Sequence, residues 1–247
     1  MLSPMPATPD RASADPASRR LVALARRIVA CERCPRLRAH CVKVACEKRR
    51  AYADWTYWGK PVPGFGDPSA RLFILGLAPG AHGANRTGRV FTGDRSGDFL
   101  FAALHRAGFA NRPESVSRDD GLALTDAYVS AAVRCAPPAN KPSPGEAANC
   151  REYLDEELAA LPCVRAVLAL GRFGHDAYLR HLQAQGAAVR LAGHPFSHGA
   201  LHRPAAGAAL FDTFHPSQQN TFTGRLKPAD LDRVLDAVKR FLARGPC

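Results

Sequence analysis

The chain has 247 residues, of which 46% are hydrophobic, and its 34 basic and 22 acidic side chains give a formal net charge of +12. This composition excludes a globally disordered chain, because unfolded chains lack the apolar residues that build a core. The length fits one α/β domain, and no apolar run approaches the roughly 20 residues that span a bilayer, so we expect no membrane segment.

The N-terminal region, rich in Pro, Ala and Ser, predicts a loose tail over residues 1–18 and a single domain over residues 19–247. It carries no apolar run typical of a secretion signal, which favours a cytoplasmic protein. Ser18 is a candidate cap for a helix over residues 19–33, where apolar residues recur at helical spacing. Nothing in the sequence requires more than a monomer.

The segment 19–50 carries eleven basic side chains against Glu32 and Glu47. A basic block on a folded surface favours a polyanionic partner, and nucleic acid is the commonest one. A solvated helix face that only aids solubility fits the same charges.

Beyond a Gly/Pro/aromatic connection over residues 53–70, apolar runs and segments with helical period alternate along the chain. The apolar runs predict buried strands over residues 71–78, 127–135, 164–171 and 209–216. The helical periods fall at residues 97–109, 144–161, 171–186 and 228–244. This alternation predicts an α/β fold class, a three-layer α/β/α sandwich around a four-stranded parallel sheet.

In such a sheet, ligands bind beyond the carboxyl ends of the strands. The loops that leave these ends are the glycine-rich "GLAPGAHGANRTGRVFTGD" over residues 76–94 and the segments 135–146, 171–176 and 215–228. We therefore expect these four loops to line one pocket.

The eight cysteines, in a chain without an export signal, indicate metal ligands or buried thiols more than disulfides. Four of them form two clusters that suit either tetrahedral zinc or a [4Fe–4S] cube: Cys31 with Cys34, and Cys135 with Cys150. Spacing does not separate the two metals. Cys41 or Cys46 could replace one of these ligands, and Cys163 reads as a buried core thiol.

The loop "GLAPGAHGANRTGRVFTGD", the segment "HPSQQNTFTGR" and the cysteine spacing together resemble the uracil-DNA glycosylase superfamily. They are most similar to its iron–sulfur family 5, the UDGb type. The resemblance implies a DNA repair enzyme that acts on single- and double-stranded DNA, flips out uracil and hydrolyses its N-glycosidic bond. It also implies a monofunctional enzyme that leaves an abasic site, with a [4Fe–4S] cluster in place of the alternative zinc.

The first motif departs from the pattern of classical members, which carry a carboxylate or amide just after the first glycine. Leu77 and Ala78 occupy those places, and Ala131 stands where family 4 has an asparagine that recognises uracil. Both departures are typical of family 5. They imply a roomier pocket that also admits hypoxanthine, xanthine or ethenocytosine.

The resemblance implies three catalytic candidates. Asp94 would position water or stabilise the cationic sugar, although it could instead cap a helix, and Asp98 is the fallback acid. His215 would stabilise the departing base through a neutral imidazole N–H. Asn140 would contact the base or the water, and an Asx turn is the equal alternative.

The base itself would stack on Phe91, for which a place in the core is the alternative. The backbone N–H groups of Gly80, Ala81 and His82 would donate to a base carbonyl, because glycine permits close approach.

The segment after His215 combines hydroxyls, amides and cations, which suits phosphate contacts and a wedge in the duplex. Its DNA-binding candidates are Ser217, Gln218, Gln219, Asn220 and Arg225. The alternative is an ordinary surface hairpin. For the whole chain, the alternatives are a non-catalytic nucleic-acid-binding module on the same scaffold, or an enzyme that binds a phosphorylated small molecule in the glycine loop.

Overall fold

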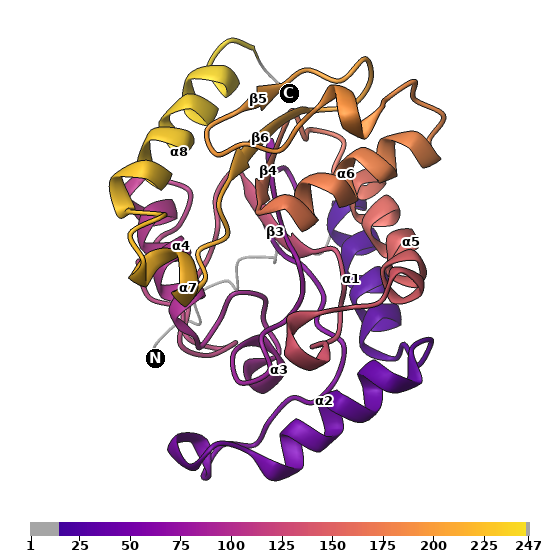
Figure 1. Cartoon of the computed structure of the whole chain (residues 1–247), viewed down its shortest axis with the longest axis vertical. Coiled ribbons are helices and arrows are strands. Elements are labelled where there is room, and N and C mark those ends of the chain that lie inside the picture. Colours follow the sequence, from indigo (N-terminus) through magenta and orange to yellow (C-terminus); the bar gives the residue numbers. More distant parts are fainter. Residues whose placement is uncertain (1–14, 246–247) are drawn as a thin grey trace, which may run out of the picture.

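The computed structural model describes residues 15–245, which build one six-stranded sheet covered by helices on both faces (Figure 1). The strand order is β1-β3-β2-β4-β6-β5. The four predicted strands are the parallel centre of this sheet: β2 (Leu72–Gly76), β3 (Ala127–Ala131), β4 (Ala166–Leu170) and β6 (Ala209–Thr213). The sequence therefore predicts the parallel core correctly.

The strand count of four is wrong, because two short antiparallel strands close the edges. β1 (Phe65–Gly66) pairs with β3, and β5 (Leu201–His202) pairs with β6. Each edge strand has only two residues and lies in a segment rich in Gly and Pro or in polar residues, so no alternating pattern announces it.

Helices cover the two faces in two distinct groups. One apolar core joins one face of the sheet to α4 (Arg95–Arg106) and α8 (Pro228–Leu242). The other joins the opposite face to α5 (Pro144–Ala160) and α6 (Arg172–Ala184), with Leu21 of α1 (Pro16–Val29) at its margin. All residues of the four central strands are buried, which explains why these runs are mostly apolar, with only Ser130, Asp212 and Thr213 as polar residues. The predicted three-layer sandwich is confirmed.

The N-terminal helices differ from the prediction. α1 begins at Pro16 and is capped by the Asp15 side chain, not by Ser18, so residues 16–18 belong to the helix and not to a tail. Residues 1–14 of the predicted tail lie outside the described residues. α2 (Pro35–Glu47) forms in the basic, cysteine-bearing segment to which we assign no element. Within residues 15–245, no helix is both long and apolar enough to cross a bilayer.

Part of the basic segment is neutralised by α5. Arg27, Arg33 and Arg36 form ion pairs with acidic residues of that helix, namely Glu152, Glu156 and Glu146. These pairs link α1 and α2 to the sandwich. The Arg36–Glu146 pair is partly buried, whereas each exposed pair contributes little to stability.

Three shorter elements complete the loops at the carboxyl edge of the sheet. They are α3 (Ala84–Thr87), the 3-10 helix Pro138–Asn140 and α7 (Gln218–Phe222). The parallel register aligns Gly76 with Ala131 and Leu170 with Thr213, so the loops that follow these residues emerge along one edge. This is the edge at which the sequence predicts a pocket.

Candidate active site

Asp94 lies between the glycine-rich loop and α4. Its Oδ1 accepts hydrogen bonds from the backbone N–H groups of Ser96 (3.0 Å) and Gly97 (3.1 Å), which caps the helix. Its Oδ2 packs against Gly80 and Gly83, so closely that a Cβ added at Gly80 would lie 2.8 Å from this oxygen. One oxygen of Asp94 therefore caps α4, and the other faces the glycine-rich loop.

The environment of Asp94 favours its neutral form more than water does. Burial raises the pKa of this carboxyl group, and Asp98 raises it further, while the N–H groups of Gly97 and Ser96 oppose the change. A partly desolvated carboxylate is a better proton acceptor than an exposed one, which suits a group that orients water. Asp98, the fallback acid, is exposed in the first turn of α4.

Phe91 and His215 lie side by side although 124 residues separate them in the sequence. Their ring centroids are 5.8 Å apart, with an angle of 35° between the planes. Phe91 has a φ of +51°, a left-handed backbone that is uncommon for Phe, and its ring covers Gly76 at the end of β2. A Cβ at Gly76 would lie 2.6 Å from the ring, so the glycine makes room for the aromatic group.

His215 follows β6 and is half-buried. The Asn220 amide donates to the backbone carbonyl of His215 (2.8 Å), and Gly171 packs against its Cβ. Within the described part of the chain, neither ring nitrogen makes a hydrogen bond. Burial lowers the pKa of His215 to about 4, so the imidazole is neutral at pH 7 and offers one N–H to a partner.

This depressed pKa predicts a pH effect on stability. The unfolded chain binds a proton at His215 near the ordinary pKa of about 6.5, and the folded chain binds it only near 4. Stability from the neutral imidazole is therefore complete above pH 6.5 and is lost as the pH falls toward 4. Urea unfolding of wild type and His215→Asn should differ in this window, with the variant falling less steeply. Parallel curves would contradict the prediction.

The glycine-rich loop has free backbone donors. Within residues 15–245, the backbone N–H groups of Gly80, Ala81 and His82 donate to no acceptor, and all three residues are half-buried. The His82 ring is turned away to Tyr57, whose hydroxyl lies 3.0 Å from Nδ1. The loop thus presents its backbone, as predicted, while the His82 side chain is already occupied.

Arg86 joins the two halves of this site, a role that the sequence does not reveal. Its Nε donates to the His82 carbonyl (2.8 Å) and its Nη2 to the Gly93 carbonyl (2.6 Å). Its guanidinium is buried and lies over the rings of Tyr52 (4.0 Å) and Trp55 (4.1 Å). Arg86 therefore fixes the donor loop relative to the segment that carries Phe91 and Asp94. The only signal in the sequence is the aromatic stretch before residue 58, which reads as loop.

Asn140 is not brought against the other candidates by any contact in the described chain. It is exposed at the end of its 3-10 helix, with a φ of +55°, and its side chain makes no hydrogen bond there. Its left-handed backbone agrees with the turn alternative.

The predicted DNA-contacting segment is a helix, not a hairpin. Ser217 caps α7, and Asn220 is turned inward to the His215 carbonyl, so both have structural partners. Gln218, Gln219 and Arg225 are exposed, and the Arg225 guanidinium lies 4.3 Å from the Phe214 ring.

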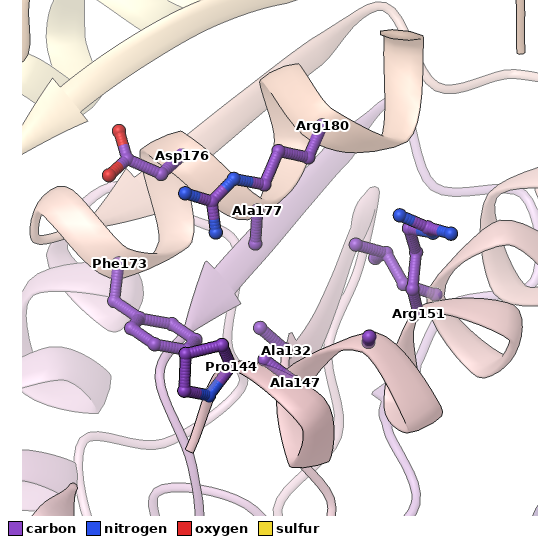
Figure 2. Close-up of a pocket in the computed structure, with 10 residues that line it drawn as sticks. Ala132, Pro144, Ala147, Arg151, Phe173, Asp176, Ala177 and Arg180 are labelled. Atoms are coloured by element: carbon purple, nitrogen blue, oxygen red, sulfur yellow. The ribbon is translucent and has the colours of Figure 1, made fainter. Parts of the chain in front are cut away.

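A cavity of about 260 Å³ lies elsewhere, between α5 and α6 (Figure 2). Its wall is mostly apolar, with Arg151, Asp176 and Arg180 at the rim. It contains none of the predicted site residues, although Pro144, Phe173 and Asp176 belong to two of the four predicted loops, 135–146 and 171–176.

Comparison with known families matches residues 63–239 to the model described as the Uracil DNA glycosylase superfamily. The chain belongs to this superfamily. It is 50% identical over 214 residues to the Type-5 uracil-DNA glycosylase of Mycobacterium bovis, a match that covers 86% of this chain and 78% of that protein. The Type-5 uracil-DNA glycosylase of Thermus thermophilus is 49% identical, covering 86% and 94%.

A Type-4 uracil-DNA glycosylase of Thermotoga maritima is only 29% identical over 72% of this chain and 83% of that protein. The contrast agrees with the type-5 resemblance carried by Leu77, Ala78 and Ala131. This type-5 family member thus has no polar side chain at those three positions.

The cysteines of this glycosylase family member lie where α2, α5 and the loop after β3 meet. Cys34, Cys135 and Cys150 share a buried cluster with Cys41. Cys31 packs against a separate apolar group formed by Leu24, Ile28 and Tyr153. The Asn149 amide donates to the Cys34 sulfur (3.5 Å). The Cys41 thiol donates to the Ala136 carbonyl (3.7 Å). Because Cys41 lies in the same buried cluster, it remains an alternative ligand.

Two other cysteines, Cys46 and Cys163, have different environments. Cys46 is exposed on α2 and does not join the cluster. Cys163 is half-buried and disulfide-bonded, so its interpretation as a buried thiol is wrong.

A buried ion pair ties the two arms that carry Cys135 and Cys150. Arg134 donates to both carboxylate oxygens of Glu157, at 3.0 and 2.7 Å, and Ser130 donates to the same group at 2.6 Å. Both charged side chains are 1% exposed. Arg134 directly precedes Cys135, and Glu157 lies on α5 two turns after Cys150, so the pair holds these cysteines at a fixed separation.

Proposed function

We propose that this chain is a uracil-DNA glycosylase, a hydrolase that cuts the N-glycosidic bond between uracil and deoxyribose. Membership of the superfamily supports the reaction class. The single structural observation that carries the proposal is the meeting of Phe91 with His215 at the edge where Asp94 and the free loop donors lie.

The chemistry follows from the charges that develop. A base inside a duplex cannot be reached, so the nucleotide must be flipped out before the bond breaks. Phe91 would stack on the base, and the neutral His215 would donate its N–H to the base oxygen as negative charge grows. The Asp94 carboxylate would stabilise the cationic sugar and orient the water that captures it. We find no amine nucleophile among the pocket residues, which favours a monofunctional enzyme that leaves an abasic site.

The range of bases would be broad. Classical members carry catalytic or uracil-recognising side chains at three positions that this chain fills with Leu77, Ala78 and Ala131. The backbone carbonyl of Leu77 already accepts a hydrogen bond from the N–H of Val133 (2.9 Å). Without a polar side chain to reject the hydrogen-bonding edges of other bases, the site would also accept hypoxanthine, xanthine or ethenocytosine.

The cysteines would bind a [4Fe–4S] cluster in preference to zinc. Four thiolates at Zn–S bonds of ~2.3 Å lie about 3.8 Å apart in a tetrahedral site. Among the described residues, three side chains place their metal-binding atoms within 4.8 Å of one another. They are His175, His202 and Asp212, and none is a cysteine. No three thiols of the described cysteines form such a group, which supports a cluster larger than a single ion. The cluster would be structural, holding α2 against α5.

Cysteine substitutions distinguish the cysteines that bind the cluster from those that do not. Cys135→Ala should lose most of the iron and visible absorbance, because a thiolate ligand is removed, whereas Cys46→Ala should keep both. Cys41→Ala should also keep them if Cys41 is not a ligand. Iron content per chain and the visible spectrum measure this. An iron-free, colourless wild-type protein that contains zinc would contradict the cluster.

The partners would be single- and double-stranded DNA, bound by the protein as a monomer through the exposed residues of α7 and Arg225. A uracil-containing oligonucleotide tests the proposal: wild type should yield alkali-labile strands and no cleavage without alkali. Salt-dependent binding of the DNA without release of uracil would instead support the non-catalytic binding module.

A further inference from the structure

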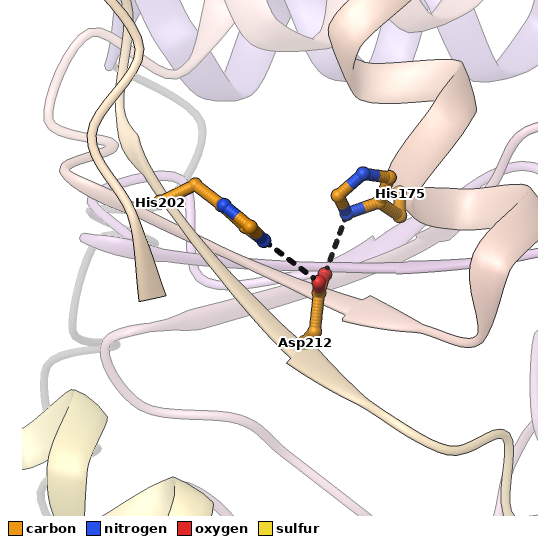
Figure 3. Close-up of side chains that lie close together, drawn as sticks. All are labelled: His175, His202 and Asp212. Carbon is orange, nitrogen blue, oxygen red and sulfur yellow. Dashed lines mark hydrogen bonds and ion pairs between the residues drawn. The ribbon is translucent and has the colours of Figure 1, made fainter. Parts of the chain in front are cut away.

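Three side chains that the proposed glycosylase chemistry does not use converge at one edge of the sheet (Figure 3). His175 comes from α6, His202 from β5 and Asp212 from β6. Asp212 Oδ1 lies 2.8 Å from His175 Nδ1, and its Oδ2 lies 3.1 Å from His202 Nε2. Asp212 and His175 are buried, while the His202 side chain is 12% exposed.

The hydrogen-bond pattern at His175 requires a cation. Its Nε2 lies 2.8 Å from the backbone carbonyl of His194, and its Nδ1 faces the Asp212 carboxylate. Both partners are acceptors only, and a neutral imidazole carries one N–H and one lone pair. Either neutral tautomer therefore points a lone pair at an oxygen. A second proton or a metal ion must lie between Nδ1 and the carboxylate.

The donor set is that of a zinc site. Zinc takes histidine nitrogen at ~2.0–2.1 Å and carboxylate oxygen at ~2.0–2.2 Å, and tetrahedral bonds of this length place neighbouring ligand atoms about 3.3 Å apart. The observed separations of 2.8 and 3.1 Å would widen by a few tenths of an ångström. The His194 carbonyl fixes the tautomer that turns the Nδ1 lone pair inward, as partners of ligating histidines do.

We propose that His175, His202 and Asp212 bind one Zn²⁺ ion, separate from the cysteine cluster. The partly exposed His202 side would leave room for a water as fourth ligand. His202 can donate its Nε2–H to Asp212, so the unmatched lone pair is that of His175, which the ion would satisfy.

The position of the site gives the ion a structural role. Asp212 also pairs through its backbone with the segment 194–202, accepting from the N–H of Gly199 at 2.9 Å. In that segment, the His198 ring stacks on Phe214, with centroids 5.0 Å apart. Phe214 directly precedes His215, so the ion would hold the segment that backs the proposed catalytic histidine.

Zinc binding to the full chain, measured by equilibrium dialysis with metal analysis, tests the site, and iron is measured in the same samples. Wild type should bind one zinc ion, and His202→Gln should bind it at least tenfold more weakly. His181→Gln is the matched control, because His181 Nδ1 lies 2.5 Å from a single carboxylate, that of Asp155, with no second histidine. The control should bind zinc like wild type.

Two results would overturn the proposal. Absence of zinc binding to wild type would mean that a proton bridges the site, and equal binding by wild type and His202→Gln would place the ion elsewhere, for example on thiolates. Thermal melting gives a second readout, because a ligand of the folded state raises Tm: zinc should raise the Tm of wild type but not of His202→Gln or His175→Gln. These readouts do not depend on glycosylase activity, so they can fail or succeed apart from the proposed function.

Discussion

Asp94→Asn should lower the rate of uracil release by a factor on the order of 10²–10⁴ while the protein stays folded. The amide keeps an oxygen that can accept from Ser96 and Gly97, and Asn caps helices about as well as Asp. It loses the negative charge that would stabilise the cationic sugar and orient water. Single-turnover release of uracil from an oligonucleotide measures the chemical step, and circular dichroism checks the fold.

Asp98→Asn is the matched control, since Asp98 lies in the same helical turn but is exposed. We expect its rate to stay within about twofold of wild type. If Asp94→Asn keeps the full rate, or if the two variants lose activity equally, the assignment of Asp94 fails.

Glu157→Gln should destabilise the fold by ~3–5 kcal/mol, because it leaves the buried Arg134 without its counter-charge. The amide can still accept from Gly64, whose N–H lies 3.2 Å from Glu157 Oε1, so the main loss is the charge. Urea unfolding followed by circular dichroism measures the free energy of unfolding.

The control is Glu156→Gln on the same helix. Its partner Arg27 is half-exposed, and a surface pair of this kind contributes only ~0–1 kcal/mol. A double substitution of Arg134 and Glu157 by apolar residues should recover much of the lost stability, because no buried charge then remains. Equal costs for Glu157→Gln and Glu156→Gln would contradict the proposed importance of the buried pair.

The sequence predicts the parallel core well because burial on both faces leaves a plain signal. The runs around Ile74 and Leu168 are apolar without interruption, and only Ser130 interrupts the run around Val129. Only a sheet covered by helices buries such strands completely. The edge strands β1 and β5 escape prediction because two residues carry no period. α2 escapes because its apolar face is small and includes Cys41.

Within the candidate site, the residues that lie in recognisable motifs are easier to foresee than those that support them. Phe91 and His215 can be foreseen from the resemblance of their loops to the family's motifs, and the structure brings their rings together. Arg86 depends on aromatic residues from a distant loop. Asn220 resembles a DNA contact in sequence but serves the backbone of His215.

The His/Asp group shows a second limit of sequence interpretation. His175 sits in an amphipathic helix, His202 in a short polar strand and Asp212 inside an apolar run, and each looks ordinary alone. The pairing of β5 and β6 and the packing of α6 bring them together, so only the tertiary structure reveals the group.

The most direct test of the central claim, that Phe91, Asp94 and His215 act together on one extruded base, is the amount of free uracil released in a single turnover by excess enzyme. Wild type should release nearly one uracil per oligonucleotide and leave an intact abasic strand, and Asp94→Asn and His215→Ala should bind the same DNA but release uracil far more slowly. Full binding by wild type with no free uracil, or release that is unchanged in both variants, would contradict the account.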